Sequence, residues 1–249
     1  MTPVLPRPAY RSTMDGMAAA KILVVEDTPE ISYVIELALA DARFDVRVAA
    51  DGEEGLRAAR HWVPDVVVLD LNLPDLDGFE VCRRLRQFTS AYVIMLTGRA
   101  DEVDKLVGLT SGADDYMTKP FSPRELTARV QVMLRRPRGG PSAPEVPHQR
   151  RTLGPVEVDL DTREVLVRGE PVPVTRIEFE LLAAISENPR QIRTRDQLRS
   201  RAWGEAWLAD DHAVDVHLSN LRRKLATAGA PDLISTVRGV GYRMNWKNL

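Results

Sequence analysis

Three short apolar runs in the first half of the chain each end at a polar side chain. The runs are Ile22–Val25, Val66–Leu69 and Tyr92–Leu96, and they consist mostly of Val, Leu and Ile. Apolar runs of this length, without polar alternation and bounded by turn residues, are typical of parallel strands that are buried on both faces. This half of the chain must therefore place its strands between two layers of helices.

The polar residues that follow these runs are of a kind that binds cations and phosphate. Glu26 and Asp27 follow the first run, Asp70 the second and Thr97 the third, and Lys119 follows a fourth, shorter run. Residues just past the carboxyl ends of parallel strands line the crevice where open α/β sheets bind ligands. Three carboxylates there would repel one another unless a cation neutralised them. The cluster therefore predicts a Mg²⁺ site with a phosphoryl group beside it.

A linker divides the chain into two domains. Residues 137–147 hold four prolines and two glycines, with no apolar period that could pack. The linker separates an expected domain at 21–136 from a second one at 148–249. The first carries 15 Lys and Arg against 20 Asp and Glu, and the second carries 16 against 14. This bias fits an acidic site in the first domain and an anion-binding module in the second.

The ends and the bulk composition exclude several classes of protein. Residues 1–20 lack the apolar core of a secretory signal, and we expect a disordered tail there, with Met14 or Met17 as alternative starts. No apolar run is long enough for a membrane span, so no membrane partner is expected. A single cysteine, Cys82, forbids an intrachain disulfide and suits the reducing cytoplasm.

Strand and helix patterns alternate through the first domain. Helices are expected at 31–42, 53–61, 78–88, 102–111 and 123–136, and further strands at 45–49 and 115–117. Ser122 and Glu125 have the spacing of a capping box at the start of the last helix. Five strand–helix units predict an α/β fold with a doubly wound, five-stranded parallel sheet of the flavodoxin-like kind.

The second domain changes from strands to helices and then to a hairpin. Short strands are expected at 156–159, 164–168 and 172–174. Helices are expected after a capping box at Thr175 and Glu178, at 194–201 and at 213–226, and a hairpin is expected around the Gly239–Gly241 turn. This order predicts an α+β winged helix-turn-helix domain.

The chemistry of the first site centres on Asp70. A carboxylate can accept a phosphoryl group to form an acyl phosphate. Asp27, Asp70 and the backbone carbonyl of Asn72 could hold Mg²⁺, with Glu26 acting through water. Lys119 and Thr97 would contact phosphate oxygens. Taken singly, each of these residues is as well explained as an ordinary turn or surface residue.

The motifs around these residues resemble those of a response-regulator receiver domain. They are Glu26-Asp27, the segment 70–78 (DLNLPDLDG), Leu96-Thr97-Gly98 and the segment 112–121 (GADDYMTKPF). The resemblance implies phosphotransfer from a partner sensor histidine kinase to Asp70, and no enzymatic activity beyond the domain's own phosphorylation and dephosphorylation. It also implies that Thr97 and Tyr116 form a switch that responds to the phosphate.

The same resemblance implies a homodimer after phosphorylation. The positions that match intermolecular ion pairs of the family are Lys105 with Glu125 and Asp115 with Arg129. Thr110 and Gln131 stand where the family commonly has a glutamate and its basic partner, so the set of pairs is reduced. Pairing within one helix, such as Glu125 with Arg129, is the alternative for these side chains.

The second domain resembles the OmpR/PhoB-type winged helix, through the segments 214–217 (VDVH), 221–225 (LRRKL) and 237–242 (VRGVGY). This resemblance implies a transcription factor that binds direct repeats of double-stranded DNA and contacts RNA polymerase near Trp203 and Trp207. The expected DNA contacts are His217, Asn220, Arg222, Arg223 and Lys224 on the basic helix, and Thr236 and Arg238 on the hairpin.

Two other functions fit the sequence less well. A stand-alone aspartyl-phosphate phosphatase or transferase would need an acid or base beside Asp70, and Asp77, the nearest candidate, is better explained as a turn residue. A DNA-binding protein that does not respond to phosphate would need a broken acidic pocket, and the sequence retains every acidic member of it.

Overall fold

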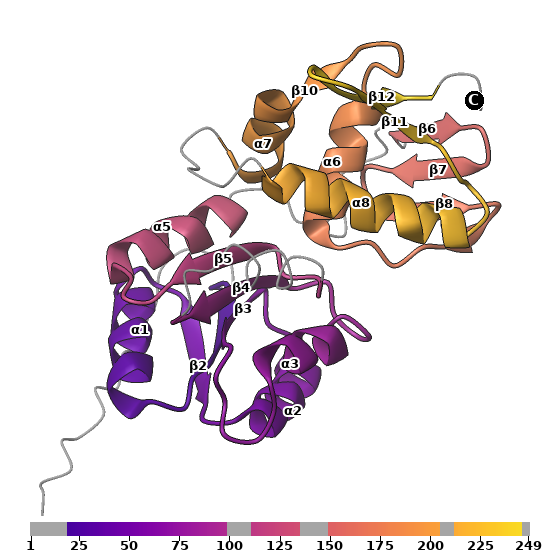
Figure 1. The fold of residues 1–249 in the computed structure, drawn as a ribbon. Coiled ribbons are helices and arrows are strands. Elements are labelled where there is room, and N and C mark those ends of the chain that lie inside the picture. Colours follow the sequence, from indigo (N-terminus) through magenta and orange to yellow (C-terminus); the bar gives the residue numbers. More distant parts are fainter. Residues whose placement is uncertain (1–18, 99–110, 135–148, 205–211, 246–249) are drawn as a thin grey trace, which may run out of the picture.

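The structure, a computed structural model, describes residues 19–98, 111–134, 149–204 and 212–245. These residues form two units, the first at 19–134 and the second at 149–245, each with its own sheet and helices (Figure 1). The expected tail and linker, and the helix expected near 102–111, lie almost entirely outside the described residues. Within the described parts, no helix is both long enough and apolar enough to cross a bilayer.

The first unit is built on a five-stranded parallel sheet, which confirms the predicted fold class. Its strand order is β2-β1-β3-β4-β5, and every neighbouring pair is parallel. The strands are β1 (Lys21–Val25), β2 (Asp45–Ala49), β3 (Val66–Asp70), β4 (Tyr92–Thr97) and β5 (Asp115–Thr118). All residues of β3 and β4 are buried, as expected for strands covered on both faces.

Helices cover both faces of this sheet (Figure 1). On one face lie α1 (Pro29–Asp41) and α5 (Pro123–Leu134), and on the other lie α2 (Gly52–Trp62) and α3 (Gly78–Leu85). The side chains of Asp51 and Asp77 accept hydrogen bonds from the first backbone N–H groups of α2 and α3. These caps set where the two helices begin.

The strand register brings the polar strand ends to one edge of the sheet. Asp70 lies opposite Leu96, one residue before Thr97, and Thr97 lies opposite Thr118, one residue before Lys119. Val25, just before the acidic pair, lies opposite Leu69, just before Asp70. Each buried Val, Leu or Ile of the strands contributes roughly 1.5–3 kcal/mol relative to exposure. A register shift would lose that burial, so the same packing that stabilises the sheet aligns the site.

The second unit holds two small sheets around three helices. The first sheet has the order β6-β7-β8-β9, and the second has the order β10-β12-β11. The strands are β6 (Arg150–Leu153), β7 (Val156–Asp159), β8 (Glu164–Val167), β9 (Glu170–Pro171), β10 (Arg193–Thr194), β11 (Ile234–Val237) and β12 (Gly241–Met244). The helices are α6 (Arg176–Ser186), α7 (Arg195–Trp203) and α8 (His212–Thr227).

Most expectations for this unit are confirmed, and one strand is wrong. The capping box of Thr175 with Glu178 is present, and β11 and β12 form the predicted antiparallel hairpin. The strand expected at 172–174 is not formed, since β9 ends at Pro171 and Val172 adds a single backbone hydrogen bond, to the oxygen of Val165 on β8. Pro173 has no N–H to donate to a ladder, and Thr175 already caps α6, so the chain cannot continue as a paired strand there.

The two units touch through side chains of α6 and α7. The indole Nε1–H of Trp203 donates a hydrogen bond of 3.0 Å to the backbone oxygen of Asp114, and the contact is buried. The guanidinium of Arg176 lies over the ring of Tyr92, 4.9 Å from its centroid. In Figure 1, α8 runs along the side of the second unit that faces β4 and β5. The helix that carries Arg222, Arg223 and Lys224 therefore lies beside the first unit.

We expect Gly78→Ala to destabilise the first unit. A Cβ at this position would lie 2.5 Å from the backbone oxygen of Asp70 and 2.7 Å from Cα of Leu71, and neither backbone atom can move without shifting the site loop. The free energy of unfolding should fall by ~1–3 kcal/mol, measured by urea denaturation. Gly98→Ala is the matched control, since no atom lies within 4 Å of its added Cβ. Equal stability of the two variants would contradict this packing.

Candidate functional site

Three carboxylates converge at the edge of the first unit's sheet. Glu26, Asp27 and Asp70 each offer an oxygen, and these oxygens all lie within 4.8 Å of one another. Glu26 and Asp70 are buried, at 1% and 2% exposure, whereas Asp27 is exposed. The sequence predicted that these carboxylates would converge, and the structure adds that Glu26 and Asp70 form a buried floor with Asp27 at the mouth of the site.

Lys119 supplies the positive charge on this floor. Its Nζ lies 2.7 Å from a carboxylate oxygen of Glu26 and 3.1 Å from Oδ2 of Asp70. The other oxygen of Asp70, Oδ1, is buried without a hydrogen-bond partner among the described residues. One lysine cannot balance three carboxylates, so the cluster retains negative charge. This donor set, made of oxygens with one of them unused, fits a hard divalent cation.

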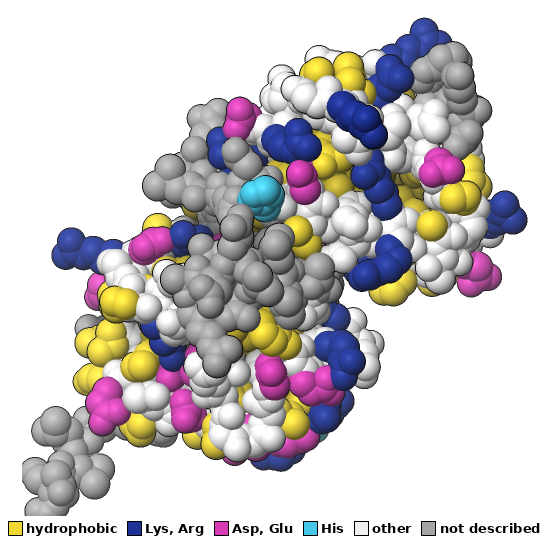
Figure 2. All heavy atoms as spheres, in the orientation of Figure 1, with side chains coloured by type: hydrophobic (Ala, Val, Ile, Leu, Met, Phe, Trp, Pro, Cys, Tyr) yellow, Lys and Arg dark blue, Asp and Glu magenta, His cyan; other side chains and the backbone are white. Residues whose placement is uncertain are grey.

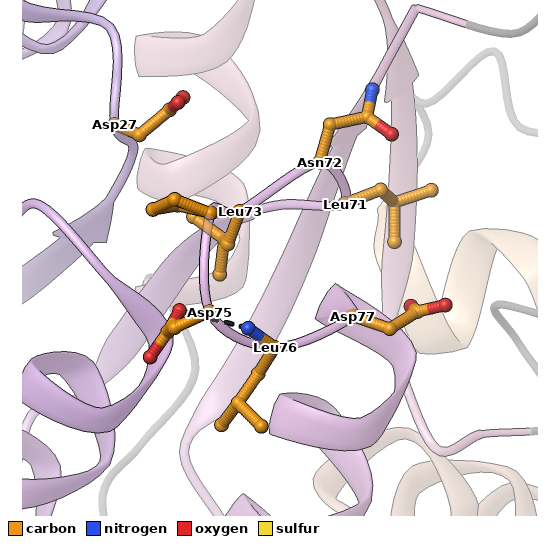
Figure 3. A pocket seen from close by; sticks show the side chains of 8 residues that line it. Asp27, Leu71, Asn72, Leu73, Asp75, Leu76 and Asp77 are labelled. Atoms are coloured by element: carbon orange, nitrogen blue, oxygen red, sulfur yellow. Dashed lines mark hydrogen bonds between the residues drawn. The ribbon is translucent and has the colours of Figure 1, made fainter.

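The loop after Asp70 forms one wall of a shallow, open cavity of about 570 Å³. Asp27 and residues 71–77 line this cavity, and Figure 3 shows Asp27 and Asn72 beside its mouth. The loop closes on itself, since Asn72 bridges to Asp77 and the N–H of Gly78 donates to the oxygen of Leu71. Asn72 is thus held next to Asp70 with its backbone close to the acidic cluster.

Asp75 holds this loop in place, a role that sequence reasoning missed. Its carboxylate accepts hydrogen bonds from the backbone N–H groups of Gly52 and Glu53, at 2.8 and 2.9 Å, at the start of α2. Figure 3 shows Asp75 among the residues that line the cavity, with its carboxylate also bonded to the N–H of Leu76. These backbone hydrogen bonds outweigh burial and lower the pKa of Asp75. In the sequence, this role is signalled only by the presence of Asp75 as an additional acidic residue between Asp70 and Asp77.

Thr97 and Tyr116 lie on adjacent strands beyond the acidic cluster. Thr97 ends β4 and is buried, and Tyr116, in the middle of β5, is partly buried against the core on the α2–α3 face. Residue 95 of β4 lies opposite Tyr116, so the tyrosine sits two residues back from the strand ends. Thr97 therefore lies at the C-terminal end of β4 and Tyr116 on the neighbouring strand, beside a position two residues earlier, and their role as a switch stays a prediction.

The residues expected at a dimer interface form pairs within this chain. Arg129 donates to the carboxylate of Asp115 at 2.9 and 3.0 Å, and also to Glu125, one turn away on α5. Burial raises the pKa of Asp115 to about 6, although Arg129 opposes this shift. Lys105 lies outside the described residues. The alternative of pairing within α5 is thus realised in this structure.

Two of the basic side chains on α8 are committed to contacts inside the second unit. Arg222 donates to the backbone oxygen of Ile234 and to the hydroxyl of Thr236, which ties α8 to the hairpin. Lys224 pairs at 2.6 Å with Glu178, which is buried. Arg223, which donates to Oδ1 of Asn220, and Arg238 are exposed, so positive charge lies on the surface at the last turns of α8 and at the hairpin turn.

Two residues expected at DNA are covered in this structure. His217 and Asn220 are 0% and 4% exposed, so neither can reach DNA in this arrangement, and their expected contacts with DNA stay a prediction. The ring of His217 lies 5.5 Å from that of Trp203, which bonds to the first unit. Trp203 is itself buried, so it is not available to RNA polymerase here, and Trp207 lies outside the described residues. No local pattern in the sequence reveals this burial, because the contact of His217 with Trp203, and of Trp203 with the first unit, joins residues far apart in the sequence.

Charge is distributed unevenly over the visible surface (Figure 2). Dark blue Lys and Arg side chains run across the second unit, and magenta Asp and Glu gather on the part of the first unit that faces away from it. The excess of acidic residues in the first domain and of basic residues in the second therefore also appears as a separation of charge on the surface.

Comparisons with known proteins match both units. The family described as the response regulator receiver domain matches residues 22–131, and the family described as transcriptional regulatory protein, C terminal, matches residues 169–244. DNA-binding response regulator MtrA of Mycolicibacterium smegmatis is 42% identical over 231 residues, which is 92% of this chain and 98% of that protein. Transcriptional regulatory protein PrrA of Mycobacterium tuberculosis is 41% identical over 228 residues, 91% of this chain and 97% of its own length.

Solved structures agree over nearly the whole chain. Two structures of RitR mutants cover 91% of this chain and 99% of their own, at 27% identity, with TM-scores of 0.73 and 0.75. The match therefore extends to both units and to their order along the chain.

We expect Asp70→Asn to stabilise the first unit in the absence of divalent cations. The change removes one of three clustered negative charges and keeps an oxygen that can accept a hydrogen bond. The free energy of unfolding should rise by about 1 kcal/mol, because functional sites of this kind hold unfavourable charge. Added Mg²⁺ should stabilise the wild type, so the difference in the free energy of unfolding between Asp70→Asn and wild type should become smaller. Asp41→Asn, at the exposed end of α1, is the control. A metal-free variant less stable than wild type would contradict the electrostatic argument.

Proposed function

The chain belongs to the OmpR/PhoB family of DNA-binding two-component response regulators, and from this premise we propose that phosphorylation of Asp70 controls its binding to promoters. The observation that carries the proposal is the meeting of Glu26, Asp27, Asp70 and Lys119 at one sheet edge. The first unit is the receiver, and the second is the winged-helix domain.

Asp70 is the phosphoryl acceptor in this proposal. One of its carboxylate oxygens forms a bond to phosphorus while the bond from phosphorus to the donor nitrogen of a sensor histidine kinase breaks, and the electron pair leaves with the donor. Oδ1 of Asp70 has no partner among the described residues, so it is the oxygen available for attack. Lys119 already contacts Oδ2 and would neutralise a phosphoryl oxygen.

The acidic cluster would hold Mg²⁺ through Glu26, Asp27, Asp70 and the backbone carbonyl of Asn72. When bound, the ion would neutralise charge on the transferring phosphoryl group. Asp75 supports this role, since its hydrogen bonds to the start of α2 keep the Asn72 loop beside Asp70. The reaction is otherwise a matter of positioning, because phosphoryl transfer asks for little covalent help from the protein.

The proposed switch is a change in conformation that begins at Thr97 and extends to the outer face of β5. The Thr97 hydroxyl would bond the phosphoryl group, and the Tyr116 ring would turn inward to follow it. This movement would change the face that carries Asp115, Glu125 and Arg129. Two phosphorylated receivers would then associate through that face, with the intrachain pair of Arg129 and Asp115 exchanged for pairs between protomers.

The winged-helix domain is proposed to bind direct repeats of duplex DNA. Arg223 and Arg238 are exposed and suited to phosphate or minor-groove contacts, while Arg222 orients Thr236 on the wing. His217 and Asn220 would contact DNA only after the receiver withdraws, and Lys224 would leave Glu178 to do so. RNA polymerase would contact the segment between α7 and α8, most of which lies outside the described residues.

We expect acetyl phosphate with Mg²⁺ to add one phosphoryl group to the wild-type chain, because Asp70 has an unpaired buried oxygen beside Lys119. Intact-protein mass spectrometry measures the addition. The Asp70→Ala variant should take up none, whereas Asp41→Ala, on the far end of α1, should match wild type. Equal labelling of Asp70→Ala would remove the assignment.

We expect DNA affinity to fall steeply with salt, and this dependence to require Arg238. Each lost phosphate contact lowers the slope of log affinity against log salt by about 1. Arg238→Ala should therefore weaken binding and reduce the slope by about 1 in electrophoretic shift titrations. Arg43→Ala, exposed in the receiver, is the control and should change neither. An unchanged slope for Arg238→Ala would count against its contact with the DNA backbone.

A further inference from the structure

Helix α8 buries a histidine where the two domains meet. His217 is completely buried, and neither of its ring nitrogens has a hydrogen-bond partner within the described parts of the chain. A neutral imidazole carries one donor and one acceptor that normally find partners when buried. Leaving both without a partner costs free energy, so His217 is not placed there to stabilise the domain.

The groups around His217 connect it to the receiver. Its ring packs against Trp203 of α7, and Trp203 donates its indole hydrogen bond to the backbone of Asp114. The side chain of Asp114 in turn accepts from Arg86 at 2.5 Å, and Arg86 also donates to the backbone oxygens of Gly112 and Ala91. Only the side chain of Trp203 therefore separates the imidazole from the receiver residues that Arg86 hydrogen-bonds together.

The charged neighbours of His217 disfavour a second proton on its ring. Arg86 acts from the receiver and Lys224 acts from α8 itself, and both are cations. Of the carboxylates nearby, Glu178 pairs with Lys224 and Oδ2 of Asp114 pairs with Arg86, while Oδ1 of Asp114 is buried without a hydrogen-bond partner among the described residues. Trp203, the α7 residue against the ring, carries no charge. Burial and these two cations lower the pKa of His217 to about 3.

We propose that His217 is a proton-sensitive latch between the domains, so that the closed arrangement requires a neutral imidazole and protonation releases α8 from the receiver. The proposal rests on the proposed DNA-binding role of α8, because release exposes His217 and Asn220 to a ligand. In the open chain the cation would be hydrated, and beside DNA it would meet phosphate rather than Arg86.

The direction of the pH effect follows from the two protonation states. The closed form holds His217 at a pKa of about 3, and the open form returns it to the ordinary value of 6.5. The closed arrangement is therefore fully favoured above pH 6.5 and loses stability as the pH falls from there toward 3. Between about pH 7.5 and about pH 5.5, the ratio of open to closed chains should rise about tenfold.

Fluorescence energy transfer in the full-length chain measures this ratio. Donor and acceptor dyes are attached at Glu36→Cys on α1 and Thr227→Cys at the end of α8, both exposed positions. The native Cys82 is buried, and burial raises the pKa of its thiol to about 11, so it stays unlabelled. The chain has four histidines. His61→Gln and His212→Gln are matched controls, since both residues are exposed.

The wild type and both controls should open about tenfold over this pH range. His217→Phe should stay more closed at every pH and lose the pH dependence, because it keeps an aromatic ring without a titrating group. His217→Leu repeats the test should the larger ring disturb packing, and circular dichroism verifies that each variant is folded. A wild type whose transfer efficiency does not change, or a His217→Phe variant that opens like wild type, would overturn the latch. Normal opening without DNA binding would instead contradict only the proposed DNA contacts.

Discussion

One partly buried cation, Lys119, holds the proposed phosphorylation site together. Lys119 contacts both Glu26 and Asp70 at the carboxyl edge of the sheet, where burial leaves the carboxylates little water to solvate them. The geometry depends on the apolar strands, since their register places β3, β4 and the residue after β5 at one level. Repulsion between the carboxylates is thus opposed by the hydrophobic burial of the strands. Because one lysine leaves the three carboxylates with net negative charge, the site suits a divalent cation together with a phosphoryl group.

A second constraint is the contact between domains. Trp203 and Arg176 bind the receiver at Asp114 and Tyr92, at the edge of the sheet opposite to Asp70. Because β5 carries Asp114 next to one end and Lys119 next to the other, movement of this strand would reach both regions. Coupling between proposed phosphorylation and DNA binding would then need no long chain of residues. It would need only that β5 and its flanking face can adopt two arrangements.

The sequence predicted most of the receiver and less of the second domain, for physical reasons. Buried parallel strands are continuous apolar runs, so their ends, and with them Glu26, Asp70 and Thr97, could be located without a structure. Short edge strands such as β6 and β10 carry little apolar pattern and were missed. The anchoring by Asp75 and the burial of His217 depend on contacts between residues far apart in sequence, 22 positions or more for Asp75, and no local pattern encodes them.

The central claim is that one chemical change at Asp70 alters DNA binding by α8. The direct measurement is the affinity of the full-length chain for one promoter fragment, before and after treatment with acetyl phosphate and Mg²⁺, at fixed salt and pH. Typical coupling energies correspond to 5–150-fold, and we expect about tenfold tighter binding after phosphorylation in wild type and no change in Asp70→Ala. Equal affinity of phosphorylated and unphosphorylated wild type would contradict the account.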